Sequence, residues 1–165
     1  VLDFGCRTGG NALAIADHVY QIFGLDHSAL GVEHAKRWSQ TREIDNAQFD
    51  ATDLFDPIYK EQSFDAITAY HVLHLLDQPE AIMHRINTLL KPDGLLISAT
   101  TCWGERRSMR KAVRELLDKI GIIPGVNKFS VAELENMVTS ANFEIIDTLV
   151  LDEKHTDYFL VARKQ

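Results

Sequence analysis

Short apolar runs alternate along the chain with stretches in which apolar residues recur every three or four positions. Runs of the first kind predict strands buried on both faces, and stretches of the second kind predict amphipathic helices. The predicted strands cover residues 1–4, 21–25, 47–51, 64–70, 94–99, 143–151 and 158–162. The predicted helices cover residues 11–19, 29–38, a segment beginning at Pro79, and 131–141.

Several local signals set the ends of these helices. Ser28 is placed to cap the second helix, and Asp77 to cap the third, which has Pro79 in its first turn. Lys-Pro-Asp-Gly at 91–94 predicts a turn, because proline cannot continue the helix and Asp-Gly supplies the bend. Ser-Val-Ala-Glu at 130–133 predicts a capping box at the start of the last helix.

The order of these elements predicts an α/β fold with a doubly wound, mostly parallel sheet. Only the polar residues Asp-Glu-Lys-His-Thr-Asp separate the last two strands. This segment is too short for a helical crossover, so the final pair is expected to be antiparallel. Ligands of such folds bind at the carboxyl ends of the strands.

A glycine-rich loop follows the first strand at that edge. Gly5, Gly9 and Gly10 let the loop turn tightly and bring backbone N–H groups close to a ligand. A phosphate-binding P-loop would need Lys followed by Ser or Thr where Asn11 stands. A dinucleotide fingerprint would need a second glycine where Arg7 stands, so this alternative is the structural runner-up.

Three acidic residues end successive predicted strands: Asp3, Asp26 and Asp50. Carboxylates at this edge would repel a polyphosphate but would accept hydrogen bonds from an amine, a ribose diol or a base amine. The plainer alternative is that some of these acids only cap turns or helices. Their recurrence at matching strand ends favours a ligand site.

Composition narrows the partners. A chain of 165 residues with a formal net charge of −7 predicts one domain and argues against a nucleic-acid or anionic-membrane surface. A small-molecule partner fits this charge better. The two cysteines of the chain, Cys6 and Cys102, suggest neither a disulfide framework nor a zinc site, so we expect a reducing, cytoplasmic setting. The first residue, Val1, already lies in an apolar run, so we expect the numbering to start within a longer polypeptide.

Taken in order, these segments resemble the class I S-adenosylmethionine-dependent methyltransferases, especially the small-molecule branch. The similarity extends over nearly the whole chain. The segments that carry it are VLDFGCRTG at 1–9, GLD at 24–26, FDATDL at 49–54, SFDA at 63–66 through His74, LKPDG at 90–94, and the helix and hairpin entry at 130–143.

The resemblance implies a seven-stranded Rossmann-like sheet with an antiparallel last strand, and S-adenosylmethionine as cofactor. It implies that Asp26 binds the ribose hydroxyls, that Asp50 meets the adenine amine and that the Ala51 backbone meets the ring. Family members usually carry a helix before the first strand, which this numbering lacks. The implied cofactor-binding residues are Asp3, Gly5, Cys6, Arg7, Gly9, Asp26, His27, Asp50, Ala51, Thr52 and Tyr70.

Arg7 departs from the family pattern, which has glycine at this position near the methionine part of the cofactor. Its side chain folds outward, pairs with the cofactor carboxylate, or weakens binding, and the sequence leaves these three alternatives open.

Methyl transfer needs mainly an aimed nucleophile and exclusion of water, so the absence of a catalytic triad is no objection. Tyr70 and His71 follow the fourth strand and are the candidate catalytic residues, because histidine suits a general base near neutral pH. We expect a packing role for His74. A metal site formed by His71, His74 and Asp77 is disfavoured, because Asp77 is better explained as a cap.

The segment after the fifth strand is the expected substrate cover. Trp103, Arg106, Arg107 and Arg110 could engage an aromatic or anionic acceptor, although a solvated helix face is the plainer interpretation. The sequence therefore predicts a single-domain methyltransferase with a small-molecule acceptor. Two alternatives stay open, a nicotinamide-dependent oxidoreductase and a non-catalytic cofactor-binding module.

Overall fold

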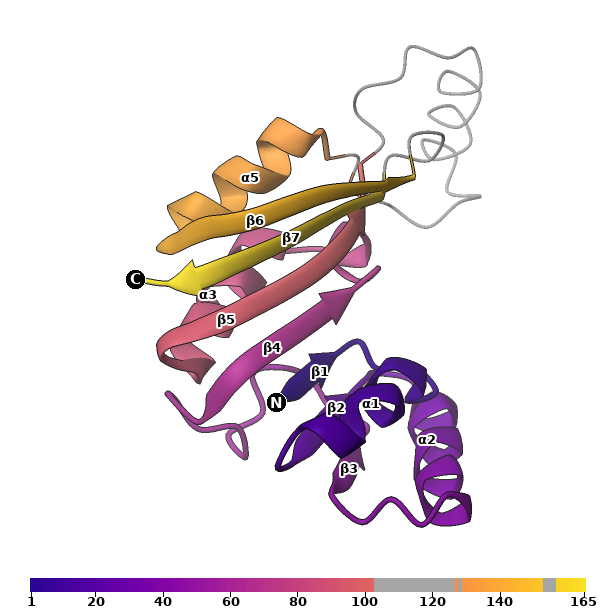
Figure 1. The fold of residues 1–165 in the computed structure, drawn as a ribbon. Helices are drawn as coiled ribbons and strands as arrows, with labels where there is room; N and C mark the ends of the chain where they lie inside the picture. The colour runs from indigo at the N-terminus through magenta and orange to yellow at the C-terminus, as the bar shows by residue number, and fades with distance from the viewer. Residues whose placement is uncertain (103–126, 128, 153–156) are drawn as a thin grey trace.

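A seven-stranded sheet with the order β3-β2-β1-β4-β5-β7-β6 forms the centre of the fold (Figure 1). The computed structural model describes residues 1–102, 127, 129–152 and 157–165. β7 is antiparallel to both β5 and β6, whereas the other neighbouring strands are parallel, which confirms the predicted sheet. The strands are β1 (Leu2–Phe4), β2 (Ile22–Leu25), β3 (Ala47–Asp50), β4 (Phe64–Tyr70), β5 (Leu90–Thr101), β6 (Phe143–Asp152) and β7 (Asp157–Lys164).

Helices cover both faces of this sheet (Figure 1). One apolar cluster joins α1 and α2 to the sheet through Ala12, Val32 and Phe49. A larger cluster joins α3 and α5 to the other face through residues such as Met83 and Leu134. The helices are α1 (Gly10–Ile15), α2 (Ala29–Thr41), α3 (Pro79–Leu89) and α5 (Val131–Ser140), with short 3-10 turns η1 (Ala16–His18) and η2 (Leu73–Leu75).

Two predicted helix caps are confirmed. The Ser28 side chain accepts a hydrogen bond from the Gly31 N–H at the start of α2. At α5, the Ser130 side chain accepts from the Glu133 N–H while the Glu133 carboxylate accepts from the Ser130 N–H, forming the expected capping box.

Two boundary predictions are wrong. Asp77 does not cap α3, because the N-cap residue is Gln78 and no side chain caps this end. Pro79 begins the helix without an N–H, which leaves one donor fewer to satisfy. The segment 91–94 is not a separate turn but lies within β5, where the pairing with β4 shifts register and Asp93 has φ 61°. The bend is thus a bulge in a continuous strand.

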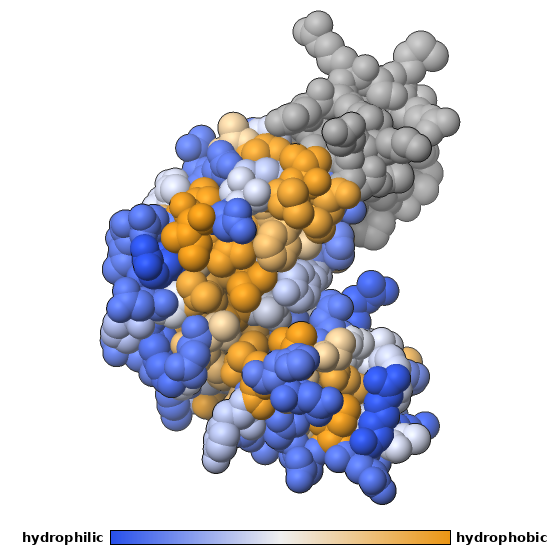
Figure 2. Space-filling model, in the orientation of Figure 1, coloured by the Kyte–Doolittle hydropathy of each residue, from blue (hydrophilic) through white to orange (hydrophobic). Residues whose placement is uncertain are grey.

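The outer strand β6 carries exposed apolar side chains. Ile146, Leu149, Val150 and Leu151 are each about half exposed. Figure 2 shows the apolar surface that extends over β5, β7 and β6. No helix in the described part of the chain is long and apolar enough to cross a membrane.

Candidate functional site

The predicted site residues gather at the carboxyl ends of β1 to β4. β1 pairs with β2 on one side and with β4 on the other, so the strand order reverses at β1. Loops that leave neighbouring strands in opposite directions open a crevice at such a switch point. The β1–α1 loop lies at this position.

The β1–α1 loop is held against the end of β2. The N–H groups of Gly5 and Cys6 both donate to the Leu25 carbonyl, at 2.9 and 3.0 Å. Gly5 has φ 77°, and a Cβ there would lie 2.8 Å from a Val72 methyl carbon. The loop therefore requires glycine both for its backbone conformation and for its contact with the segment after β4.

Gly9 has a second packing role. Its φ is 80°, and a Cβ would lie 2.8 Å from the Ala35 Cβ of α2. Glycine at this position lets the start of α1 approach α2 closely.

Arg7 adopts a left-handed conformation with φ 52°. This conformation is costly for a residue with a Cβ, which gives a physical reason for the glycine of the family pattern. The Arg7 N–H donates to Asp26 Oδ2 at 2.9 Å, and the Arg7 residue is exposed. The exposed side chain is compatible with each of the three alternatives for Arg7.

Asp26 anchors this loop. Its Oδ2 accepts from the Arg7 N–H at 2.9 Å and its Oδ1 accepts from the Ser28 N–H at 2.8 Å. Asp26 therefore does stabilise local turns, as the plainer alternative for the strand-end acids expects. A carboxylate has about four acceptor positions, so a half-buried Asp26 keeps capacity for two further donors.

Asp50 lies beside Asp26. Leu25 and Asp50 are register partners in the parallel β2–β3 pair, and the Asp26 N–H donates to the Asp50 carbonyl at 3.2 Å. His27 and Ala51, the residues that follow these two acids, are both exposed. The edge therefore presents two neighbouring carboxylates flanked by accessible chain.

Thr52 is turned toward its own loop. Its hydroxyl donates to Asp56 Oδ2 at 2.7 Å. The hydrogen bond from the Ile58 N–H, followed by this one, lowers the pKa of Asp56. The side chain of Thr52 thus has a structural partner, and a contact with the predicted cofactor would come from its backbone.

Asp3 is the buried acid of the site. It is 2% exposed, its Oδ1 accepts from the Thr68 hydroxyl at 2.7 Å, and its Oδ2 has no hydrogen-bond partner among the described residues. Burial raises the pKa of Asp3 to about 6, against the opposing effect of Thr68. A nearby positive charge would stabilise the ionised carboxylate.

The Cys6 thiol takes no part in the crevice. The side chain packs in the apolar cluster under α1 and α2 and is 5% exposed. Burial, helped by the charges of Asp3 and Asp26, raises the pKa of Cys6 to about 12. The thiol is therefore neutral and unreactive near pH 7, and a contact of Cys6 with the predicted cofactor would come from its backbone.

Tyr70 and His71 end β4 at the same edge. Tyr70 is half-buried, and burial followed by the Asp3 charge raises its pKa. His71 has φ 52°, its N–H donates to the Ala99 carbonyl at 2.7 Å, and the residue is exposed. The last β4–β5 hydrogen bond thus holds an unusual backbone conformation that presents an accessible imidazole.

The remaining candidates from the sequence are His74, the disfavoured metal site and four residues of the segment after β5. His74 is half-buried in η2, and no group of three or more His, Cys, Asp or Glu residues in the described ranges could hold a metal ion. Trp103, Arg106, Arg107 and Arg110 lie outside the described residues.

Two contributors to the site were missed in the sequence. Thr68 is the register partner of Asp3 and binds its carboxylate, and Val72 packs against Gly5. Thr68 could have been found in the sequence, because it is a polar residue within an otherwise apolar strand, two positions before Tyr70. The contact of Val72 depends on the chain path after β4, which no local pattern reveals.

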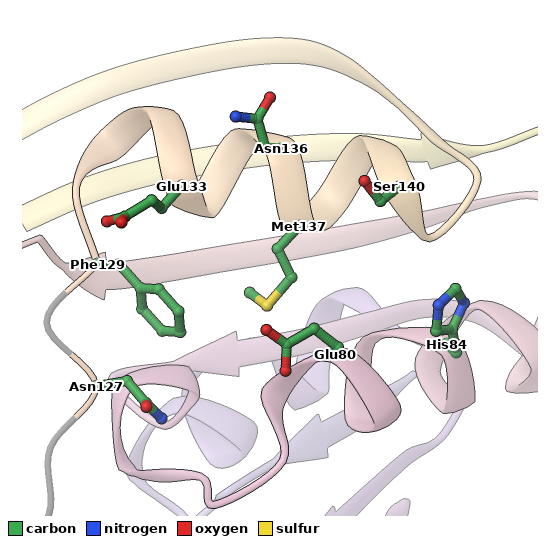
Figure 3. A pocket seen from close by; sticks show the side chains of 8 residues that line it. All are labelled: Glu80, His84, Asn127, Phe129, Glu133, Asn136, Met137 and Ser140. Atoms are coloured by element: carbon green, nitrogen blue, oxygen red, sulfur yellow. The ribbon is translucent and has the colours of Figure 1, made fainter.

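A cavity of about 440 Å³ lies between α3 and α5, away from these residues (Figure 3). Met137 and Phe129 supply apolar surface, and Glu80 points toward them from α3 (Figure 3). None of the residues predicted to bind cofactor or to act in catalysis lines this cavity. The complete lining is Glu80, His84, Asn127, Phe129, Glu133, Asn136, Met137 and Ser140.

Comparison with known proteins identifies the family. A sequence profile described as "Methyltransferase domain" matches residues 1–148. A ubiquinone biosynthesis O-methyltransferase of Coxiella burnetii is 29% identical over 100 residues, which cover 61% of this chain and 42% of that protein. The mitochondrial arginine-hydroxylase NDUFAF5 of Danio rerio is 28% identical over 163 residues, which cover 95% of this chain and 48% of that protein.

The fold matches as well. The crystal structure of the [4+2]-cyclase SpnF superposes with a TM-score of 0.82 at 22% identity, covering 99% of this chain and 73% of that one. The chain spans less than half the length of the two curated relatives described above. The profile match covers most of the sequence and decides against the oxidoreductase alternative. This chain belongs to the class I S-adenosylmethionine-dependent methyltransferases.

Proposed function

We propose that this chain, as one domain, transfers a methyl group from S-adenosylmethionine to a small-molecule acceptor. The observation that carries the proposal is a set of carboxylates on three neighbouring strands beside a glycine loop: Asp3 within β1, Asp26 directly after β2, and Asp50 at the end of β3. A ligand with an ammonium, a ribose diol and a base amine offers donors to each of them.

The residues present fit this cofactor. Asp26 retains acceptor positions for the ribose hydroxyls after binding the Arg7 and Ser28 N–H groups. Asp50 and the exposed backbone at Ala51 lie on the neighbouring strand for the adenine. Asp3 supplies negative charge near the methionine end.

When bound, S-adenosylmethionine supplies an already activated methyl group. The protein then needs to orient the acceptor and to remove a proton where the acceptor is protonated. The exposed imidazole of His71 is the proposed general base. The half-buried Tyr70 is proposed to contact cofactor or acceptor from the same strand end.

Three observations support a small-molecule acceptor in the cytoplasm. The net charge of −7 disfavours nucleic acid, and one relative is named for ubiquinone biosynthesis. The chain has only two cysteines, far apart in sequence, a composition that is usual for proteins of a reducing compartment. Another relative is named as an arginine-hydroxylase and a structural neighbour as a cyclase, so a test must include protein acceptors.

Transfer of tritiated methyl groups from S-adenosylmethionine into a cell extract tests the proposal. We expect label in the small-molecule fraction, and we expect Asp26→Ala to reduce it strongly. Label confined to the protein fraction would overturn the proposed acceptor class. Tight cofactor binding without transfer to either fraction would favour the non-catalytic module.

A further inference from the structure

The loop from Thr52 to Tyr59, called the 52–59 loop below, is joined by its own hydrogen bonds. The Thr52 hydroxyl donates to Asp56 Oδ2 at 2.7 Å, and Asp56 Oδ1 accepts from the Ile58 N–H at 2.9 Å. The Tyr59 N–H donates to the Asp56 carbonyl at 3.1 Å, and the Asp56 N–H donates to the Asp53 carbonyl at 3.2 Å. Because these bonds overlap along the loop, a displacement of one end is transmitted to the other.

The 52–59 loop directly follows the residues proposed to contact adenine. Asp50 ends β3, and the exposed Ala51 stands between Asp50 and Thr52. β3 is a strand of four residues that lies at the edge of the sheet and pairs with β2. A short edge strand is held by one neighbour, so the position of Asp50 and Ala51 also depends on how the 52–59 loop is held.

Arg85 of α3 attaches the 52–59 loop to the rest of the fold. Its Nε donates to the Leu54 carbonyl at 3.1 Å, and its Nη2 donates to the Tyr59 carbonyl at 2.9 Å. Arg85 is half-buried, and no acid among the described residues forms an ion pair with it. The planar guanidinium, whose donors have a fixed geometry, therefore bridges two carbonyl groups of one loop.

We infer that Arg85 is a positioning residue for adenine recognition, because its bridge to the 52–59 loop holds Asp50 and Ala51 where they meet the base. The inference rests on the proposed function, since it requires the adenine at the end of β3. Arg85 acts through the loop and not by touching the cofactor. Loss of the bridge is expected to weaken the contacts of the base and to leave those of the ribose and the methionine part intact.

Calorimetric titration of the whole chain with two ligands that differ in the base tests this role. S-adenosylhomocysteine carries an amino group on the base, and S-inosylhomocysteine carries a carbonyl oxygen in its place. The Asp50 carboxylate can accept from the amine but repels the oxygen, so the unmodified protein is expected to prefer S-adenosylhomocysteine by at least about tenfold. This ratio of affinities, the adenine preference, reports the base contacts because the rest of the ligand is the same.

Arg85→Met removes both donors and keeps a long apolar side chain. S-adenosylhomocysteine is expected to bind about fivefold more weakly, as for the loss of one hydrogen bond, whereas affinity for S-inosylhomocysteine is expected to stay within about twofold. The adenine preference therefore falls. Arg85→Lys keeps the charge but has a single nitrogen, which can reach one carbonyl group at a time, so an intermediate preference is expected.

Lys164→Met is the matched control for Arg85→Met. Lys164 of β7 is also half-buried, and its Nζ also donates to two backbone carbonyl groups, that of Asn87 at 2.7 Å and that of Leu90 at 2.8 Å. Leu90 begins β5, so this bridge lies at the opposite end of the parallel strands from Asp50. Lys164→Met is expected to lower stability in urea and to leave the adenine preference unchanged.

The outcomes separate this inference from the proposed function. An adenine preference that falls in Arg85→Met, is intermediate in Arg85→Lys and is unchanged in Lys164→Met supports the inference. An unchanged preference in Arg85→Met, or an equal fall in Lys164→Met, overturns the inference and leaves the cofactor assignment intact. If Arg85→Met does not fold, Arg85→Lys decides, and a preference equal to that of the unmodified protein overturns the inference. Binding of neither ligand by the unmodified protein overturns both proposals.

Discussion

The Arg7 N–H donates to Asp26 Oδ2 at 2.9 Å, so the loop after β1 and the end of β2 are joined by a backbone donor and a carboxylate. The same carboxylate binds the Ser28 N–H at the start of α2. Asp26 thus joins the loop after β1 to the start of α2.

Arg7→Gly is expected to stabilise the fold. A residue with a Cβ pays about 1–2 kcal/mol for a left-handed conformation, and glycine adopts φ 52° without this cost. Glycine also loses more conformational entropy on folding, which offsets part of the gain in stability. Thermal unfolding is expected to show a gain of at most about 1 kcal/mol. We propose that the exposed Arg7 side chain is directed away from the cofactor, so affinity for S-adenosylhomocysteine is expected to stay within about threefold, or 0.7 kcal/mol.

Arg7→Ala is the control for Arg7→Gly, since it removes the guanidinium without relieving the backbone. A large loss of affinity in both variants would instead mean that the guanidinium grips the cofactor carboxylate. Tighter binding in both would mean that the side chain obstructs the site.

Asp26→Ala is expected to reduce both affinity and stability. Binding of S-adenosylhomocysteine is expected to weaken about tenfold or more, through loss of a charged acceptor. Two backbone N–H groups lose their partner, so the free energy of unfolding in urea is expected to fall by about 1–2 kcal/mol. This figure allows for the partial exposure of Asp26 to solvent. Ser28→Ala is the matched control, because it removes the α2 cap and is expected to lower stability alone. Unchanged affinity in Asp26→Ala would contradict the ribose role.

His71→Asn is expected to slow methyl transfer about 100-fold if the identified acceptor is protonated. Asparagine tolerates positive φ, so the change preserves the strand end while it removes the base. Calorimetry is expected to give unchanged affinity for S-adenosylhomocysteine. A full transfer rate in this variant, with such an acceptor, would refute the assignment of His71 as the base.

Asp3→Asn is expected to change the pH dependence of stability. The folded-state pKa of Asp3 is raised to about 6, so its contribution is present at low pH and is lost as the pH rises through this value. Relative to the unmodified protein, Asp3→Asn is expected to gain about 2 kcal/mol between about pH 4.5 and about pH 7.5.

Urea unfolding at several pH values tests this expectation. Asp65→Asn is a control of opposite sign, because Lys91 lowers the pKa of Asp65, and the stability that this pair contributes is lost as the pH falls. Parallel stability curves for the unmodified protein and Asp3→Asn would contradict the raised pKa of Asp3.

Most of the fold follows from the alternation of apolar runs with helical spacing, because each buried strand and each amphipathic helix repeats a local rule. The antiparallel final pair followed from a connection too short for a helix. The bulge at Asp93 could not be predicted, because a turn sequence and a bulge sequence use the same residues and the pairing with β4 decides between them. Asp77 is not the cap of α3 because the helix begins at Pro79, which places the N-cap position at Gln78.

The position of the candidate site was predictable, but its internal contacts were not. Asp26 and Asp50 end adjacent parallel strands, so their proximity follows from topology. The bonds from the Arg7 N–H to Asp26 and from the Thr68 hydroxyl to Asp3 join residues far apart in sequence, and only the folded chain reveals them.

Calorimetric titration of the unmodified protein with S-adenosylhomocysteine, NAD and NADP in parallel tests the central claim most directly. The acidic strand ends and the loop around Arg7 predict saturable binding of S-adenosylhomocysteine at one site and no binding of either nicotinamide cofactor. Binding of NAD or NADP without S-adenosylhomocysteine would contradict the assignment of this edge as an S-adenosylmethionine site.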